Sequence, residues 1–200
     1  MTGESTSSTP AAPRRGVHPL PAALSGARLA AALVMILSVH LGLTPVALFW
    51  LVLGAALSDY LDGWLARCIK RCSYEGKILD FLADKVFLAV SLLVLSMAGA
   101  PHTTIVAPVV ASYHLVVLLA TTIVSWGTGR PLIAVPTGEK LVHIFSYVLA
   151  SAAAGAAAFT GKGVYLKIAE VSGYLTLAAV AFGAAGYLRL VRRLLVRFPK

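Results

Sequence analysis

The sequence predicts an all-α integral membrane protein built from six transmembrane helices, with both termini in the cytoplasm. Of its 200 residues, 58% are hydrophobic and 12% are charged, whereas an ordinary soluble domain carries about 25% charged residues. Six apolar segments are long enough to cross a membrane, for which roughly 20 residues are needed. The formal net charge of +9 fits basic helix ends that face anionic lipid better than a nucleic-acid partner, because aromatic residues are few.

The chain divides into a polar N-terminal segment, residues 1–19, and a membrane domain, residues 20–200. The first segment is rich in Ser, Thr and Pro, so we expect it to be disordered or interfacial. A secretory signal peptide is less favoured than an uncleaved first helix, because the apolar run after Pro21 is long and lacks a small-x-small stop. The apolar segments, which turns rich in Gly and Pro separate, are residues 20–42, 44–68, 76–99, 104–126, 138–159 and 164–188.

Basic residues set the predicted orientation in the membrane. Arg and Lys gather near the N-terminus, in the two links that follow the second and fourth segments, and in the C-terminal tail, while the opposite ends carry only Lys162 and Lys167. By the positive-inside rule, both termini and the link after the second segment lie on the cytoplasmic side of the membrane, which we expect to be the cell (inner) membrane. The tail from Leu188 to Lys200 is typical of the snorkelling end of the sixth helix, more than of a separate interfacial helix.

Half of the eight acidic residues are aspartates in one short stretch, namely Asp59, Asp62, Asp80 and Asp84. A carboxylate within such apolar sequence is costly and therefore indicates function. The spacings i, i+3 and i, i+4 place each pair on one helix face. Since the link between the two segments is short, we expect an antiparallel hairpin that brings the four carboxylates together. One or two divalent cations would balance their charge, and oxygen ligands favour Mg, Mn or Ca over zinc.

Neighbouring residues indicate phosphoryl chemistry at these carboxylates. A carboxylate-bound metal pair neutralises phosphate oxygens and steadies a leaving group. Gly63 and Gly76 allow a ligand to approach the backbone closely, and Arg67 is placed to hold a phosphate with two hydrogen bonds. The alternative is a membrane-edge charge network, which explains two spaced pairs with two glycines less well. Its cations would be Arg67, Lys70, Arg71, Lys77 and Lys85.

The pattern Asp59-x-x-Asp62-Gly63-x-x-Ala66-Arg67, eight residues, then Gly76-x-x-x-Asp80-x-x-x-Asp84 resembles the signature of the CDP-alcohol phosphatidyltransferase family. The resemblance implies a six-helix membrane enzyme, usually a homodimer, whose partners are CDP-diacylglycerol, an acceptor alcohol and membrane lipid. Such enzymes displace CMP from the CDP-linked lipid by the hydroxyl group of the acceptor.

The resemblance also implies roles for single residues. The four aspartates, Asp59, Asp62, Asp80 and Asp84, would hold two divalent cations, Mg or Mn, and Asp84 would act as the general base on the acceptor hydroxyl. The cytidine diphosphate would lie against Asp59, Gly63, Arg67, Gly76 and Asp80.

Weaker features bear on the acceptor. Ala83-Asp84-Lys85 resembles the corresponding part of phosphatidylglycerophosphate synthases and bacterial-type cardiolipin synthases. Residues 21–28, with Ala22 where Asn is usual, and residues 136–140 resemble parts of the glycerophosphate enzymes. In one departure, Tyr113-His114 stands in the fourth segment where those synthases usually carry an Arg-acid pair. A phosphate-bearing acceptor needs cationic donors, for which Arg28, Arg130 and Lys140 are the candidates. Glycerol 3-phosphate is the favoured acceptor.

Alternatives to this acceptor and to this activity stay open. Phosphatidylglycerol as the acceptor would give cardiolipin, and another alcohol would give another phospholipid. A cation-binding membrane transporter would use the aspartates differently, but it should show broken mid-membrane helices or an inverted repeat. We leave the histidines out of the predicted site, although His143 lies one helical turn from Glu139.

Overall fold

The protein is described here from a computed structural model, which places residues 19–69, 74–128, 137–159, 161 and 163–197. The polar N-terminal segment and Arg130 therefore lie outside the described residues. The backbone of the helix ends nearest the predicted site is described, but some of their side chains are not. These are the side chains of residues 62–69 and 74–79, which include Asp62, Gly63, Arg67 and Gly76.

Six α-helices make up the described chain, which confirms the all-α prediction. They are α1 (Pro19–Leu41), α2 (Pro45–Ile69), α3 (Tyr74–Met97), α4 (Val106–Thr128), α5 (Thr137–Ala158) and α6 (Gly163–Arg197). Five of them end close to the predicted boundaries. Helix α6 continues without a break past the predicted apolar segment to Arg197, as expected if the basic tail is the end of the sixth helix rather than a separate interfacial helix.

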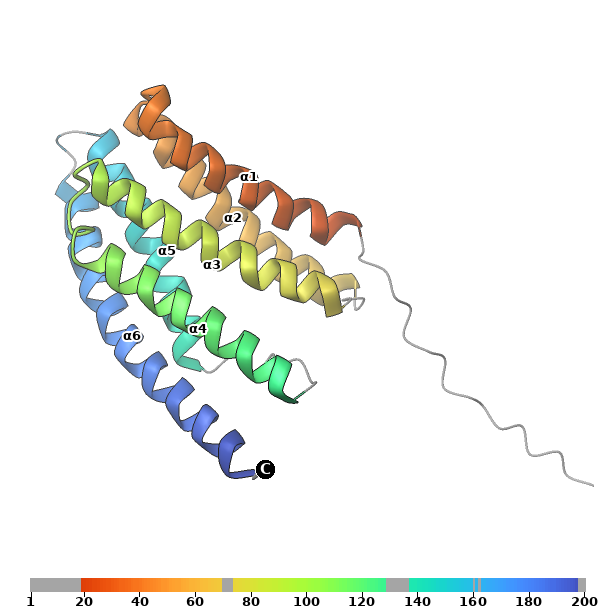
Figure 1. Ribbon diagram of the computed structural model, residues 1–200. Coiled ribbons are helices and arrows are strands. Elements are labelled where there is room, and N and C mark those ends of the chain that lie inside the picture. The colour runs from red at the N-terminus through yellow and green to blue at the C-terminus, as the bar shows by residue number, and fades with distance from the viewer. Residues whose placement is uncertain (1–18, 70–73, 129–136, 160, 162, 198–200) are drawn as a thin grey trace, which may run out of the picture.

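Consecutive helices alternate in direction along an elongated bundle (Figure 1). The start of α1, the ends of α2 and α4, and the C-terminal end of α6 therefore point toward the same end of the bundle. Helix α5 contacts α2, α3 and α6, whereas α1 packs on α2 and α3. The interior is formed by apolar side chains that are fully buried, among them Met35, Val52, Phe87, Leu88 and Leu149.

Local sequence ends the helices at the far side of the bundle from the aspartates. Gly42 and Gly99 adopt positive φ angles of 62° and 73° after α1 and α3, a conformation that glycine tolerates without strain. After α3 the Ala100 N–H donates to the carbonyl of Leu95 at 2.9 Å, as in a Schellman cap. Thr44 caps α2 through its hydroxyl oxygen. These turns let α1–α2 and α3–α4 fold back as antiparallel pairs.

Outward-facing positions on the helices carry large apolar side chains, as expected of surfaces that meet lipid. Trp50, Leu115, Val116 and Ile123 are each at least 58% exposed. Within the described residues, three helical stretches are long and apolar enough to cross a membrane, namely Val106–Ile123, Thr137–Ala158 and Gly163–Leu190. Membrane crossing by the other helices stays a prediction.

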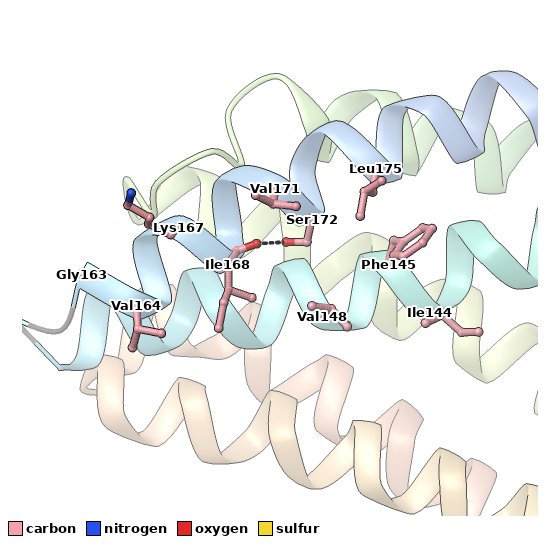
Figure 2. A pocket seen from close by; sticks show the side chains of 10 residues that line it. All are labelled: Ile144, Phe145, Val148, Gly163, Val164, Lys167, Ile168, Val171, Ser172 and Leu175. Carbon is pink, nitrogen blue, oxygen red and sulfur yellow. Dashed lines mark hydrogen bonds between the residues drawn. The ribbon is translucent and has the colours of Figure 1, made fainter.

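An apolar groove of about 570 Å³ lies between α5 and α6, on the outside of the bundle (Figure 2). Ten residues line it, none of them acidic: Ile144, Phe145, Val148, Gly163, Val164, Lys167, Ile168, Val171, Ser172 and Leu175. This lining suits hydrocarbon rather than phosphate or a metal ion, so the groove is a poor site for phosphoryl chemistry.

Helices α5 and α6 approach closely where glycines face each other. A Cβ atom built on Gly138 would lie 2.6 Å from the Cα atom of Gly183. We therefore expect Gly138→Ala to lower the stability of the protein by about 1–3 kcal/mol through overpacking, as measured by thermal unfolding in detergent. The matched control is Gly54→Ala, since a Cβ atom at that exposed helical position meets nothing within 4 Å. Equal stability of the two variants would contradict the close approach of α5 and α6.

Candidate active site

Three of the four aspartates, Asp59, Asp80 and Asp84, lie around the guanidinium group of Arg28, which α1 carries into the bundle. Its Nη1 atom donates to Asp80 Oδ1 at 2.8 Å and also contacts Asp84 Oδ1. Its Nη2 atom lies 3.7 Å from Asp59 Oδ1. The Arg28 side chain is 1% exposed, whereas those of Asp80, Asp59 and Asp84 are 42%, 28% and 14% exposed. The three carboxylates are therefore partly exposed, whereas the guanidinium that they contact is buried.

Two serines, from α1 and α2, also contact this cluster. Ser25, one turn before Arg28, donates to Asp80 Oδ1 at 3.3 Å. Ser58 accepts from Arg28 Nε at 3.3 Å. The hydrogen bonds hold the guanidinium plane between α2 and α3, so that it reaches carboxylates from both helices.

Helix α5 adds a histidine to the cluster, which sequence reasoning left out. The Nε2 atom of His143 lies 3.1 Å from Asp59 Oδ2. Asp59, Asp84 and His143 each offer one ligand atom, and these three atoms lie within 4.8 Å of one another. The ring of His143 packs edge-on against Tyr147, with centroids 4.9 Å apart. A signal for it existed in its spacing from Glu139, but only the packing of α5 on α2 shows which face points inward.

The charge of the cluster fits a divalent cation. Three ionised carboxylates and one guanidinium leave a formal charge of about −2, which a divalent cation would balance, and hard oxygen donors suit Mg or Mn. Asp59, Asp80 and Asp84 belong to the predicted metal set. The side chains of Asp62 and Arg67 and the surroundings of Gly63 and Gly76 are outside what the structure describes, so the roles of these four residues stay predictions.

The three cations predicted to bind the acceptor differ in their surroundings. Arg28 is buried and forms ion pairs with Asp80 and Asp84. Lys140 is exposed on the first turn of α5. Arg130 lies outside the described residues. Binding of an acceptor by any of them stays a prediction.

A second buried polar cluster, which sequence reasoning missed, joins α3, α4 and α5. Lys85 forms an ion pair with Glu139, and both side chains are 4% exposed. Tyr113 donates to Glu139 Oε2 at 2.5 Å, and His114 Nδ1 lies 3.8 Å from Glu139 Oε1. Lys85 thus pairs with Glu139, whereas the proposed membrane-edge network required it to pair with the aspartates. Tyr113 and His114, the departure from the usual Arg-acid pair, are the α4 side of this cluster.

The family of the chain follows from a comparison with known sequences. The sequence model described as CDP-alcohol phosphatidyltransferase matches residues 18–185. This range includes Arg28, the aspartate hairpin and the second polar cluster. The chain belongs to the CDP-alcohol phosphatidyltransferase family. Family membership confirms the resemblance seen in the motif, and together with the apolar helices it identifies a membrane protein.

One curated relative of this phosphatidyltransferase-family chain is the CDP-diacylglycerol–glycerol-3-phosphate 3-phosphatidyltransferase of Aquifex aeolicus. The two sequences are 58% identical over 43 residues, which is 22% of this chain and 24% of the relative. The chain thus matches about a quarter of the length of that relative. No solved structure matches the chain.

The Lys85–Glu139 pair makes a testable contribution to stability. Lys85→Met leaves the Glu139 carboxylate buried without its cation, for which we expect a loss of about 3–5 kcal/mol. The double variant Lys85→Met/Glu139→Gln removes both charges and keeps an acceptor for Tyr113, so it should recover most of that loss. Thermal unfolding in detergent measures both. A double variant no more stable than Lys85→Met would contradict the pairing.

Proposed function

We propose that this protein transfers the phosphatidyl group of CDP-diacylglycerol to an acceptor alcohol and releases CMP. The observation that carries this proposal is the convergence of Asp59, Asp80 and Asp84, from two helices, on one buried guanidinium. The same aspartates stand at the signature positions of the family to which the chain belongs. A cation-binding transporter is less well supported, because the described helices α1–α6 run without breaks.

Two divalent cations, Mg or Mn, would be held by Asp59, Asp62, Asp80 and Asp84. The residual negative charge and the oxygen donors of the described aspartates support this assignment. When bound, the cations would neutralise pyrophosphate oxygens and stabilise the departing CMP. Arg28 would keep Asp80 and Asp84 in place, since it hydrogen-bonds both.

Asp84 would act as the general base. It is the least exposed of the three described aspartates, which supports a position beside the reacting hydroxyl rather than the more open nucleotide. The acceptor oxygen would bond to the phosphorus that carries the diacylglycerol, its proton would pass to the Asp84 carboxylate, and the bond from that phosphorus to the CMP oxygen would break. Gly63, Arg67 and Gly76, with Asp59 and Asp80, would bind the cytidine diphosphate.

Glycerol 3-phosphate is the acceptor that we favour. The matched stretch of the Aquifex aeolicus relative supports it, because that relative is named for transfer to glycerol 3-phosphate. The exposed Lys140, at the end of α5 that also carries His143, is placed to meet an anionic group. Arg28 and Arg130 are the other proposed donors. Phosphatidylglycerol, which would give cardiolipin, is the alternative acceptor, because the Tyr113-His114 departure removes an expected arginine.

We further propose that all six helices of the domain, residues 20–200, cross the inner membrane, with both termini and the aspartates at the cytoplasmic side. The alternating helix directions support this placement, since they put the start of α1, the end of α2, the start of α3 and the end of α6 at one end of the bundle (Figure 1). Among the described residues, the helix ends there carry Arg67, Lys77, Arg189 and Arg192, as the positive-inside rule expects of a cytoplasmic face. A homodimer is the proposed assembly, as the resemblance implies.

The proposed activity is tested by measuring CMP release from CDP-diacylglycerol by the purified protein with Mg²⁺ or Mn²⁺. Separate reactions contain glycerol 3-phosphate, glycerol, phosphatidylglycerol or no acceptor. We expect release that needs both the cation and glycerol 3-phosphate. Release with phosphatidylglycerol instead would replace the acceptor assignment, and no release with any acceptor would overturn the activity.

In the same assay Asp84→Asn should lower turnover by at least about 100-fold, since general-base catalysis contributes roughly that much or more. Binding of CDP-diacylglycerol should remain detectable, because the amide keeps the shape of the side chain. Glu170→Gln is the matched control, as this carboxylate is exposed on α6. Unchanged turnover in Asp84→Asn, or loss of lipid binding together with turnover, would remove Asp84 from the role of base.

A further inference from the structure

We propose that His143 is a direct nitrogen ligand of the metal site that Asp59 and Asp84 form, so that the site prefers Mn²⁺ over Mg²⁺. This inference rests on the proposed function, since it deepens the metal assignment made there. The donors come from three helices, α2, α3 and α5, whose packing brings one ligand atom of each residue within 4.8 Å of the others.

The two carboxylate oxygens of Asp59 face different partners. Arg28 approaches Oδ1 of Asp59, and the Nε2 atom of His143 faces Oδ2. The guanidinium of Arg28 and the imidazole of His143 therefore lie on different sides of the Asp59 carboxylate. A metal ion between Oδ2 of Asp59 and the imidazole would not need to displace the guanidinium of Arg28 from Oδ1.

Aromatic packing holds the imidazole of His143 in this direction. Tyr147, one turn later on α5, meets the ring edge-on, and Tyr147 itself is stacked on the buried Phe87 of α3, with centroids 6.2 Å apart. The His143 side chain is 22% exposed and that of Asp59 is 28% exposed, so an ion from the solvent can reach both. A fixed, accessible imidazole is the arrangement that a metal ligand requires.

A simple hydrogen bond from His143 to Asp59 accounts for part of this geometry. The third group, Asp84, is brought near Asp59 by the guanidinium of Arg28, which contacts both carboxylates, and it offers a further oxygen donor in the same 4.8 Å cluster. Donors on one cation at about 2.0–2.2 Å lie at most about 4.4 Å apart, so a small closing movement would bring all three onto one ion. The residual charge of the cluster favours that ion.

The donor set decides which cation is preferred. Mg²⁺ and Mn²⁺ both take carboxylate and water ligands, but Mg²⁺ dehydrates reluctantly and keeps several waters. Mn²⁺, as a first-row transition ion, exchanges a water for an imidazole nitrogen more readily than Mg²⁺ does. Adding His143 to two carboxylates therefore shifts the preference of the site toward Mn²⁺. Loss of the imidazole should weaken Mn²⁺ binding by at least about tenfold, the lower limit for the loss of a supporting residue of a metal site, and should change Mg²⁺ binding little.

The test is electron spin echo envelope modulation, a method that detects nitrogen coordinated to Mn²⁺. It is applied to Mn²⁺ bound to the full chain in a nitrogen-free buffer. We expect nitrogen modulation in the unsubstituted protein, and a change in its frequency when the protein contains isotopically labelled histidine. This readout needs no variant and no turnover. The Mn²⁺ dissociation constant is measured in parallel for His143→Gln, and for His40→Gln, an exposed histidine in the last turn of α1, as the control.

Nitrogen modulation that His143→Gln abolishes and His40→Gln preserves, with the expected loss of Mn²⁺ affinity, would support the proposal. Bound Mn²⁺ without nitrogen modulation, or modulation that survives in His143→Gln, would overturn it. These outcomes are separable from failure of the proposed function. CMP release without nitrogen modulation keeps the transferase and removes His143, whereas nitrogen modulation without CMP release keeps the metal ligand and removes the transferase.

Discussion

The interaction between the buried guanidinium of Arg28 and three aspartates is the constraint on which the rest of the site depends. Carboxylates from α2 and α3 repel one another when they converge in apolar surroundings, where charges interact more strongly than in water. Arg28 offsets part of this repulsion from below, because α1 packs against both helices. About two negative charges stay uncompensated, which the proposed divalent cation would balance.

Helix α5 completes the site because it is held deep in the bundle on two sides. The facing glycines Gly138 and Gly183 let it lie close to α6, and the ion pair of Lys85 with Glu139 joins it to α3. Glu139 and His143 are one helical turn apart, so the contact that fixes the start of α5 also directs His143 to Asp59. The second polar cluster thus positions α5 beside the aspartates, because its cation, Lys85, directly follows Asp84 on α3.

Hydropathy and turn residues predicted the six helices well, because an apolar run bounded by Gly42 or Gly99 leaves the backbone few other choices. Spacing alone placed Asp80 and Asp84 on one face of a helix. The partners of these residues were not predictable in the same way. Arg28 is more than 50 positions from Asp80, and its pairing depends on how α1 is rotated against α3, which no local pattern encodes. Glu139 looked isolated for the same reason, since its cation and its hydroxyl donor lie on other helices.

The central claim, that Arg28 and a divalent cation share the charge of the same carboxylates, is tested most directly by thermal unfolding of the unsubstituted protein and of Arg28→Gln. Each is measured with and without Mg²⁺, and with K⁺ at matched ionic strength as the control. A cation that binds only the folded state raises the unfolding temperature. We expect Mg²⁺ to raise it in both proteins, and more in Arg28→Gln, where the aspartates lack their internal cation. An unfolding temperature that Mg²⁺ leaves unchanged in both proteins would contradict the account.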